Sequence, residues 1–205
     1  MEIELKYTIP DEETAKALWD NELFGLYEEK DTREEINLHA KYYDTADLDL
    51  ARNDIAYRVR LENNDPVATI KWKGHSEDGL HVREEINVPA DSDEPNPELF
   101  QESRMGAKLM EVIADKELKC IMETKIHRQQ FRIDTGEGIY EFSVDEGEVV
   151  TECGSQPIRE VEIELYSGET EEMVKIGEKL QNKYGLTSEN KSKYAKGLEM
   201  IKGCE

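Results

Sequence analysis

Several features are scarce in this 205-residue chain, and each shortage excludes a class of protein. The three cysteines, Cys120, Cys153 and Cys204, are odd in number and widely spaced, so we expect neither a disulfide framework nor a cysteine metal site. Such sparse cysteine is typical of a reducing, cytoplasmic environment. No apolar run approaches the ~20 residues that cross a bilayer, and no hydrophobic leader follows the acidic N-terminus. We therefore expect no membrane segment and no secretory signal.

Basic residues are also scarce. The chain has 26 Lys and Arg residues against 48 Asp and Glu residues, which gives a formal net charge of −22 at pH 7. Nucleic-acid binding requires a basic footprint, so we expect no nucleic-acid partner. A small polyanionic substrate is compatible with this charge only if the cations gather in one sheltered site.

The chain is rich instead in strand-like segments whose charges are largely of one sign. Glu2, Glu4 and Lys6 occupy alternate positions with apolar residues between them, so in a strand they share one face. An ordinary solvated sheet face mixes its charges, because like charges at neighbouring positions repel. The same alternation returns in six further segments, at Arg58 and Arg60, Lys71 and Lys73, Arg83 and Glu85, Arg128 and Arg132, Glu141 and Asp145, and Glu160, Glu162 and Glu164.

These charged faces favour a closed sheet. Isolated buried ions cost several kcal/mol each, so the charges must stay hydrated or paired. A barrel with a hydrated, charged lumen meets this need and leaves no sheet edge. Apolar stripes predict helices after Asp11, from Pro97 to about residue 118 with a break near Gly106, and from Thr170 to Gly185. We therefore predict an α+β fold, a single domain over residues 1–205, with an antiparallel closed barrel and helices packed on its outside.

The order of the motifs resembles the CYTH family, the triphosphate tunnel metalloenzymes, which includes class IV adenylate cyclases, thiamine triphosphatases and inorganic triphosphatases. Glu2-x-Glu4-x-Lys6 is similar to the family's N-terminal signature, and the resemblance extends to about residue 200. It departs from the family at Tyr57, where leucine is usual, and before Arg128, where a Lys-x-Arg spacing is absent. The other matching motifs follow in the family's order: Tyr42-Tyr43-Asp44-Thr45, Arg58-x-Arg60, Lys71-x-Lys73, Arg83-x-Glu85, Arg128, Asp145, the Glu160 to Glu164 strand and Ser192-Lys193-Tyr194.

The resemblance implies an eight-stranded tunnel that binds a triphosphate group and acts on it with a divalent metal. Mg²⁺ or Mn²⁺ suits carboxylate ligands, and arginine suits bidentate contacts with phosphate. The implied metal ligands are Glu2, Glu4, Asp145 and one or more of Glu160, Glu162 and Glu164. The implied substrate contacts are Lys6, Arg58, Arg60, Lys71, Lys73, Arg83, Arg128, Arg132 and Lys193. The implied catalytic residues are Glu2, Glu4, Lys6 and Glu164, and Glu85 is a further tunnel residue.

Three functions are compatible with this set of residues. We expect hydrolysis of inorganic triphosphate to pyrophosphate and phosphate, because every recognisable ligand suits a phosphate and none suits a base or sugar. A class IV-type adenylate cyclase is the alternative within the same fold and requires a purine pocket. A non-catalytic polyphosphate-binding module is the third, although it does not need the carboxylates. Thiamine triphosphate and RNA 5′-triphosphate are also possible substrates. The sequence does not determine the oligomeric state.

Overall fold

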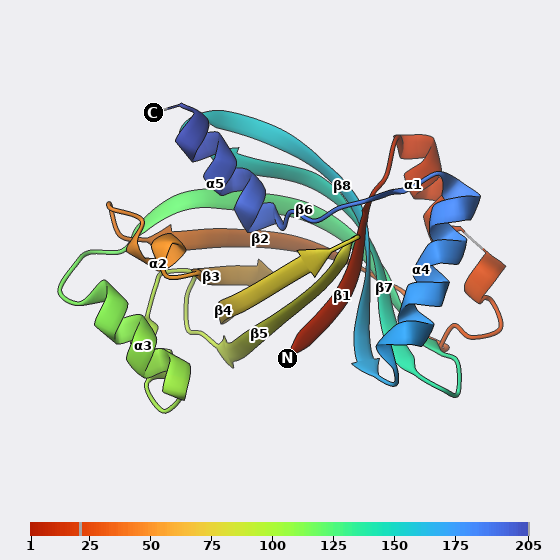
Figure 1. Ribbon diagram of the computed structural model, residues 1–205, viewed down its shortest axis with the longest axis horizontal. Helices are drawn as coiled ribbons and strands as arrows, with labels where there is room; N and C mark the ends of the chain where they lie inside the picture. The colour runs from red at the N-terminus through yellow and green to blue at the C-terminus, as the bar shows by residue number, and fades with distance from the viewer. Residues whose placement is uncertain (21, 205) are drawn as a thin grey trace.

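The strands of this protein pair into a closed antiparallel barrel in the computed structural model, which describes residues 1–20 and 22–204 (Figure 1). Closure occurs at β1, which pairs with β8 on one side and with β5 on the other, and the two-residue β9 (Thr187–Ser188) also pairs with β1. The strands of the barrel wall are β1 (Glu2–Thr8), β2 (Glu34–Asp44), β3 (Ile55–Glu62), β4 (Asp65–Glu77), β5 (Leu80–Pro89), β6 (Lys119–Asp134), β7 (Ile139–Thr151) and β8 (Gly154–Ser167). The predicted eight-stranded barrel is confirmed.

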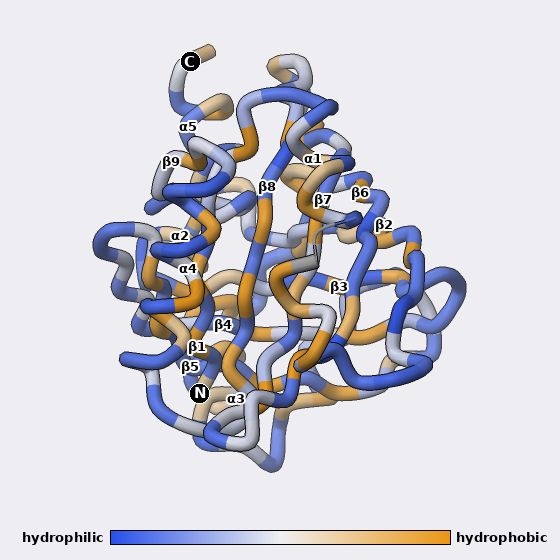
Figure 2. Tube along the Cα trace, turned by 90° about the vertical axis from the view of Figure 1, so that its right-hand side faces the viewer, coloured by the Kyte–Doolittle hydropathy of each residue, from blue (hydrophilic) through white to orange (hydrophobic). Residues whose placement is uncertain are grey.

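Alternation along the strands separates the two faces of the wall. Val161 and Ile163 of β8 are fully buried, and Figure 2 shows hydrophobic and hydrophilic positions alternating along this strand. Glu162 and Glu164 occupy the alternate positions of this strand. In the register, Glu162 lies opposite Lys6 of β1 and Glu164 lies opposite Glu4. Cross-strand partners point to the same side of a sheet, so the charged side chains of neighbouring strands meet inside the barrel.

Most helices cover the apolar outer face of the wall. α1 (Glu12–Trp19) and α4 (Thr170–Tyr184) pack over β1, β7 and β8 at the right of Figure 1. α3 (Arg104–Ile113) and the short η2 (Pro97–Phe100) pack over β3 and β4, near the one-turn α2 (Asp49–Arg52). A further 3-10 turn, η1 (Glu22–Phe24), follows α1. Within the described residues, no helix has the length and apolar content needed to cross a bilayer.

The helix predicted after Pro97 breaks earlier than expected. α3 begins at Arg104, and the hydroxyl of Ser103 caps it by accepting a hydrogen bond from the Gly106 backbone N–H at 2.9 Å. Gly106 therefore lies inside the helix, not at a break. A Cβ atom at this position would overlap the carbonyl of Phe100, so a glycine is required where the two short helices pack together.

The last helix, α5 (Lys193–Gly203), covers one end of the barrel. Its Tyr194 stacks on Tyr42 of β2, with ring centroids 5.4 Å apart. Cys204, at the end of α5, forms a disulfide with Cys153 in the turn between β7 and β8. The expectation of no disulfide was wrong for this pair. The two cysteines are 51 residues apart, and only the packing of α5 on the barrel brings them together.

Candidate active site in the tunnel

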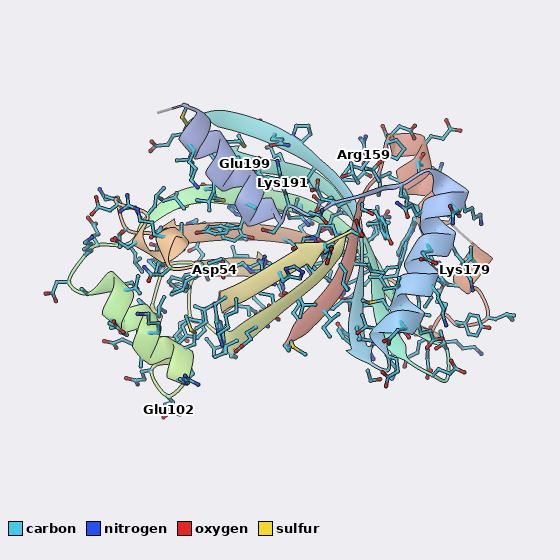
Figure 3. The ribbon with its side chains drawn as sticks, viewed as in Figure 1. Asp54, Glu102, Arg159, Lys179, Lys191 and Glu199 are labelled. Atoms are coloured by element: carbon cyan, nitrogen blue, oxygen red, sulfur yellow. A yellow bond between two sulfur atoms is a disulfide. The ribbon has the colours of Figure 1, made fainter. Side chains whose placement is uncertain are left out.

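A cavity of about 340 Å³ lies inside the barrel, and charged side chains from both halves of the chain line it. In contrast, the exposed Glu102 and Lys179 lie on the outer surface of the molecule (Figure 3). The structure thus brings together most of the residues that the sequence predicts for the site. Those lining the cavity are Glu2, Glu4, Lys6, Arg58, Arg60, Lys71, Arg83, Glu85, Arg128, Asp145, Glu162, Glu164 and Lys193.

One side of the cavity is acidic. Glu2 and Glu4 project from β1, Glu164 from β8 and Glu141 from β7, where Glu141 lies directly opposite Glu164. Burial, together with repulsion from the other three carboxylates, raises the pKa of Glu164 to about 8. Basic side chains therefore do not fully compensate this cluster. A bound cation would offset the repulsion.

The acidic side has the chemistry of a divalent-metal site. Mg²⁺ and Mn²⁺ prefer carboxylate oxygens, and Glu2, Glu4 and Glu164 are the side chains that would hold such an ion. The uncompensated charge at Glu164 fits that assignment. Among the described residues, however, no three His, Cys, Asp or Glu side chains already surround a common point. Metal binding would therefore require these carboxylates to turn toward one another.

Another part of the cavity wall is basic and only partly neutralised. Within residues 1–20 and 22–204, the guanidinium groups of Arg58 and Arg83 have no carboxylate within 4.0 Å, and the buried Nε of Arg58 has no hydrogen-bond partner. Arg60 pairs with Glu62, while burial and the neighbouring Arg58 lower its pKa. Guanidinium groups that lack a direct carboxylate partner, as those of Arg58 and Arg83 do, suit the binding of an anion.

Two lysines connect the acidic and basic parts. Lys6 Nζ lies 2.9 Å from Glu162 and 3.2 Å from Glu4. Burial alone would lower the pKa of Lys6, but these carboxylates raise it above its ordinary value, so the ammonium is a fixed positive charge. Lys71 Nζ lies 2.6 Å from Glu2 and 2.9 Å from Glu85.

A second network ties the start of α5 to the tunnel wall. Arg128 donates two hydrogen bonds of 2.7 Å to Asp145 and one of 2.6 Å to Glu162. Lys193 lies 2.8 Å from each of these two carboxylates and 2.9 Å from Glu160. Burial opposes ionisation of Glu162, yet the neighbouring cations hold its pKa well below the usual range. Asp145 and Glu162 therefore bind cationic side chains in this structure.

Lys73 does not face the tunnel, and its predicted position was wrong. Its side chain is 70% exposed and pairs with Glu84 at 3.1 Å. A β-bulge between Trp72 and His75 shifts the pairing of β4 with β5. Simple alternation, which holds for Lys71, fails two residues later because the bulge inserts an extra residue.

Arg132 and Glu160 alternate in step with the tunnel-facing residues of their strands, as the sequence predicts, but they lie outside the cavity. Arg132 contacts Glu29 at 3.5 Å and the ring of Tyr166 at 5.7 Å, beyond one end of the tunnel. Glu160 is fully buried, and its carboxylate lies 2.5 Å from Lys196 as well as beside Lys193. Alternation along a strand predicts on which face of the sheet a side chain lies, but it does not predict how far along the barrel axis that side chain lies.

Two side chains at the cavity, Glu141 and His81, were not predicted as site residues from the sequence. Glu141 shares its strand parity with Asp145, so the signal was present, and it accepts a hydrogen bond from the Tyr166 hydroxyl at 2.8 Å. His81 is buried, with its Nε2 donating to the Glu189 carbonyl at 2.7 Å. Its Nδ1 therefore accepts from the Ser76 hydroxyl, and burial and nearby Lys6 lower its pKa. Both ring nitrogens are thus already engaged.

A closed antiparallel barrel with carboxylates and guanidinium groups around one interior cavity defines a charged tunnel protein. The CYTH domain profile matches residues 1–198, and the chain belongs to the CYTH family. This confirms the resemblance seen in the order of the sequence motifs.

Known relatives agree with this assignment. The chain is 27% identical over 161 residues to an inorganic triphosphatase of Haemophilus influenzae, covering 76% of this chain but only 44% of that protein. It is similar in structure to HpAC1 from Hippeastrum, an adenylyl cyclase candidate with a dominant triphosphatase activity (TM-score 0.73, 24% identity, 95% and 94% of the two chains). The mimivirus capping enzyme triphosphatase is more distant (TM-score 0.51, 11% identity, 88% and 89%). These two structures show a shared fold.

Proposed function

We propose that this protein is a divalent-metal-dependent hydrolase of triphosphate, and that inorganic triphosphate is its preferred substrate. The observation that carries the proposal is the presence of two opposite and incompletely neutralised charge clusters in one cavity. Within the described residues, Glu164 has no cation within 4.0 Å, and neither Arg58 nor Arg83 has a carboxylate within that distance. A metal bound to a triphosphate supplies both missing charges, because the cation suits the first cluster and the phosphate oxygens suit the second.

The residues of the chain have distinct roles in this proposal. Arg58, Arg60 and Arg83 bind phosphate oxygens, and the ammonium groups of Lys6 and Lys71 stabilise the charge that develops on the leaving pyrophosphate. Glu2, Glu4 and Glu164 would hold Mg²⁺ or Mn²⁺, and the bound ion would supply electrostatic stabilisation and orientation of the attacking water. The water oxygen bonds to the terminal phosphorus, the bond to the bridging oxygen breaks with its electron pair leaving on pyrophosphate, and a proton passes to solvent.

Relatives support hydrolysis over the alternatives. One is named an inorganic triphosphatase and another is described by its dominant triphosphatase activity. This chain spans less than half of the curated relative's length, so the activity proposed here rests on the tunnel residues themselves. None of the contacts described above assigns a cavity residue to a purine, which a cyclase would need.

A substrate screen tests the proposal. Phosphate release is measured from inorganic triphosphate, ATP, thiamine triphosphate and pyrophosphate, each with Mg²⁺ and with Mn²⁺. We expect inorganic triphosphate to be hydrolysed fastest and pyrophosphate slowest, because pyrophosphate cannot span both charge clusters. Cyclic AMP formed from ATP would favour the cyclase, and tight triphosphate binding without product would favour the binding module.

A further inference from the structure

We propose that Gly74 is a positioning residue for Arg83: the bulge in β4 leaves a slot without a side chain, and the guanidinium of Arg83 lies in that slot at the tunnel wall. The inference rests on the proposed function for the role of Arg83 in binding phosphate. The contact between Gly74 and Arg83 is independent of that function.

The register around the bulge places two residues of β4 opposite one residue of β5. Trp72 pairs with Glu84, and the next pair is His75 with Val82, so Lys73 and Gly74 together face Arg83. Such a two-against-one arrangement is a β-bulge, a device that re-aims side chains and is frequent beside active sites. The structure shows a bulge at the point where the charged face of β4 meets that of β5.

Lys73 takes the strained conformation in this bulge. Its φ of 52° lies in the left-handed region, which is unfavourable for a non-glycine residue. This conformation directs the lysine to the outside, where its side chain pairs with Glu84. Without the bulge, alternation would place the Lys73 ammonium on the tunnel side, close to the Arg83 guanidinium. The backbone strain thus removes a competing cation.

Gly74 then provides space for the guanidinium. A Cβ atom at Gly74 would lie 2.8 Å from both Nε and Nη2 of Arg83, closer than real Cβ contacts come, and a tight 3.1 Å from Cζ. The φ of Gly74 is not in the left-handed region, so any residue could adopt its backbone conformation. The absence of a side chain at this position therefore affects where the Arg83 guanidinium lies, and the chain geometry itself does not require glycine.

No ion pair within the described part of the chain holds Arg83 in place, since no carboxylate lies within 4.0 Å of its guanidinium. Its Cα neighbour on β1 is Glu2, a member of the acidic cluster, and Arg83 itself lines the cavity. Packing against the bare backbone of Gly74 therefore helps to set where this cation meets a bound phosphate. Loss of the slot would move the guanidinium without breaking a salt bridge.

The substitution Gly74→Ala tests this assignment. The atoms that a new methyl group would displace are the end of a flexible side chain, so we expect the fold to persist, with circular dichroism and the unfolding temperature close to wild type. We expect binding of tripolyphosphate, measured by calorimetry in EDTA, to weaken about tenfold, the effect of losing ~1.4 kcal/mol. The matched control is Gly203→Ala, because Gly203 has open space around its Cβ position and an ordinary φ.

A double-mutant cycle shows whether Gly74 acts through Arg83. In an Arg83→Ala background, Gly74→Ala should weaken tripolyphosphate binding no further. Wild-type binding by Gly74→Ala, or losses that add fully in the double variant, would overturn the assignment. The readout is binding in EDTA, so this test does not depend on hydrolysis. If the protein binds tripolyphosphate but never hydrolyses it, the proposed function is refuted, while the role of Gly74 can still be tested.

Discussion

At the scale of single residues, Glu164 is the most informative side chain of the tunnel. Its carboxylate lies among Glu2, Glu4 and Glu141, and burial with their repulsion raises its pKa to about 8. Glu164→Gln keeps the shape of the side chain and removes the charge that a metal would bind. We predict that this variant folds normally but loses about 10²–10³-fold in triphosphate turnover, a loss typical of removing one preorganised electrostatic group. Steady-state kinetics at saturating Mg²⁺ measures it, and turnover near the wild-type rate would exclude Glu164 from the metal site.

The same pKa predicts how stability depends on pH in the absence of metal. The ordinary pKa of a glutamate is 4.5, and that of Glu164 in the folded protein is about 8. Between these values the native state holds a proton that the unfolded chain has lost, so the free energy of unfolding falls as pH rises through this window. We predict that urea unfolding in EDTA shows a steeper decline from pH 5 to pH 8 for wild type than for Glu164→Gln. Parallel curves would show that Glu164 titrates normally.

The two lysines of β4 give a further test at the residue scale. Lys71 bridges Glu2 and Glu85 in the tunnel, whereas Lys73 is exposed and pairs with Glu84. We predict that Lys71→Ala lowers kcat/KM for triphosphate at least tenfold, because a cation beside the acidic cluster is lost. Lys73→Ala should stay within about twofold of wild type, as surface substitutions usually do. Equal losses in both variants would contradict the placement of Lys73 outside the tunnel.

At the scale of elements, α5 is fastened to the barrel by a buried ionic network. Lys193 neutralises Asp145, Glu160 and Glu162 at distances of 2.8–2.9 Å. Lys193→Met leaves these carboxylates without their shared counter-ion, and removing one partner of a buried ion pair costs about 3–5 kcal/mol. We predict a clear drop in the free energy of unfolding, measured in urea.

The control for this prediction lies two residues away in the chain. Lys191 pairs with Glu199 on the protein surface, so Lys191→Met should leave stability unchanged. Adding Asp145→Asn to Lys193→Met should recover part of the loss, because it removes one of the carboxylates that repel each other. No recovery in the double variant would show that the destabilisation comes from lost packing of α5 and not from charge.

The element scale also shows what the sequence could predict and what it could not. Alternation predicted the charged face of almost every strand, because period-2 geometry is a local property of the chain. It failed at Lys73, where a bulge breaks the period. It also gave no depth along the barrel, so it predicted Arg132 as a substrate contact and kept Glu160 as one of three possible metal ligands, although neither lines the cavity. The Cys153–Cys204 disulfide escaped prediction because it depends on where α5 docks, which is a tertiary property.

At the scale of the whole molecule, the closed barrel explains how a chain with a net charge of −22 could bind a polyanion. The cations of the tunnel wall face an interior cavity, whereas acidic segments such as residues 11–13 are exposed to solvent. Closure through the β1–β5 and β1–β8 pairings brings the first strand beside the last long strand. Glu4 and Glu164 thus meet although they stand near opposite ends of the chain.

The measurement that tests the central proposal most directly is phosphorus NMR of inorganic triphosphate incubated with the purified protein. With Mg²⁺ or Mn²⁺, we predict that each triphosphate yields one pyrophosphate and one phosphate, and that excess EDTA stops the reaction. Addition of surplus Mg²⁺ should then restore it. Product that forms at the same rate in EDTA, or a stable complex that yields no product with either metal, would contradict the account.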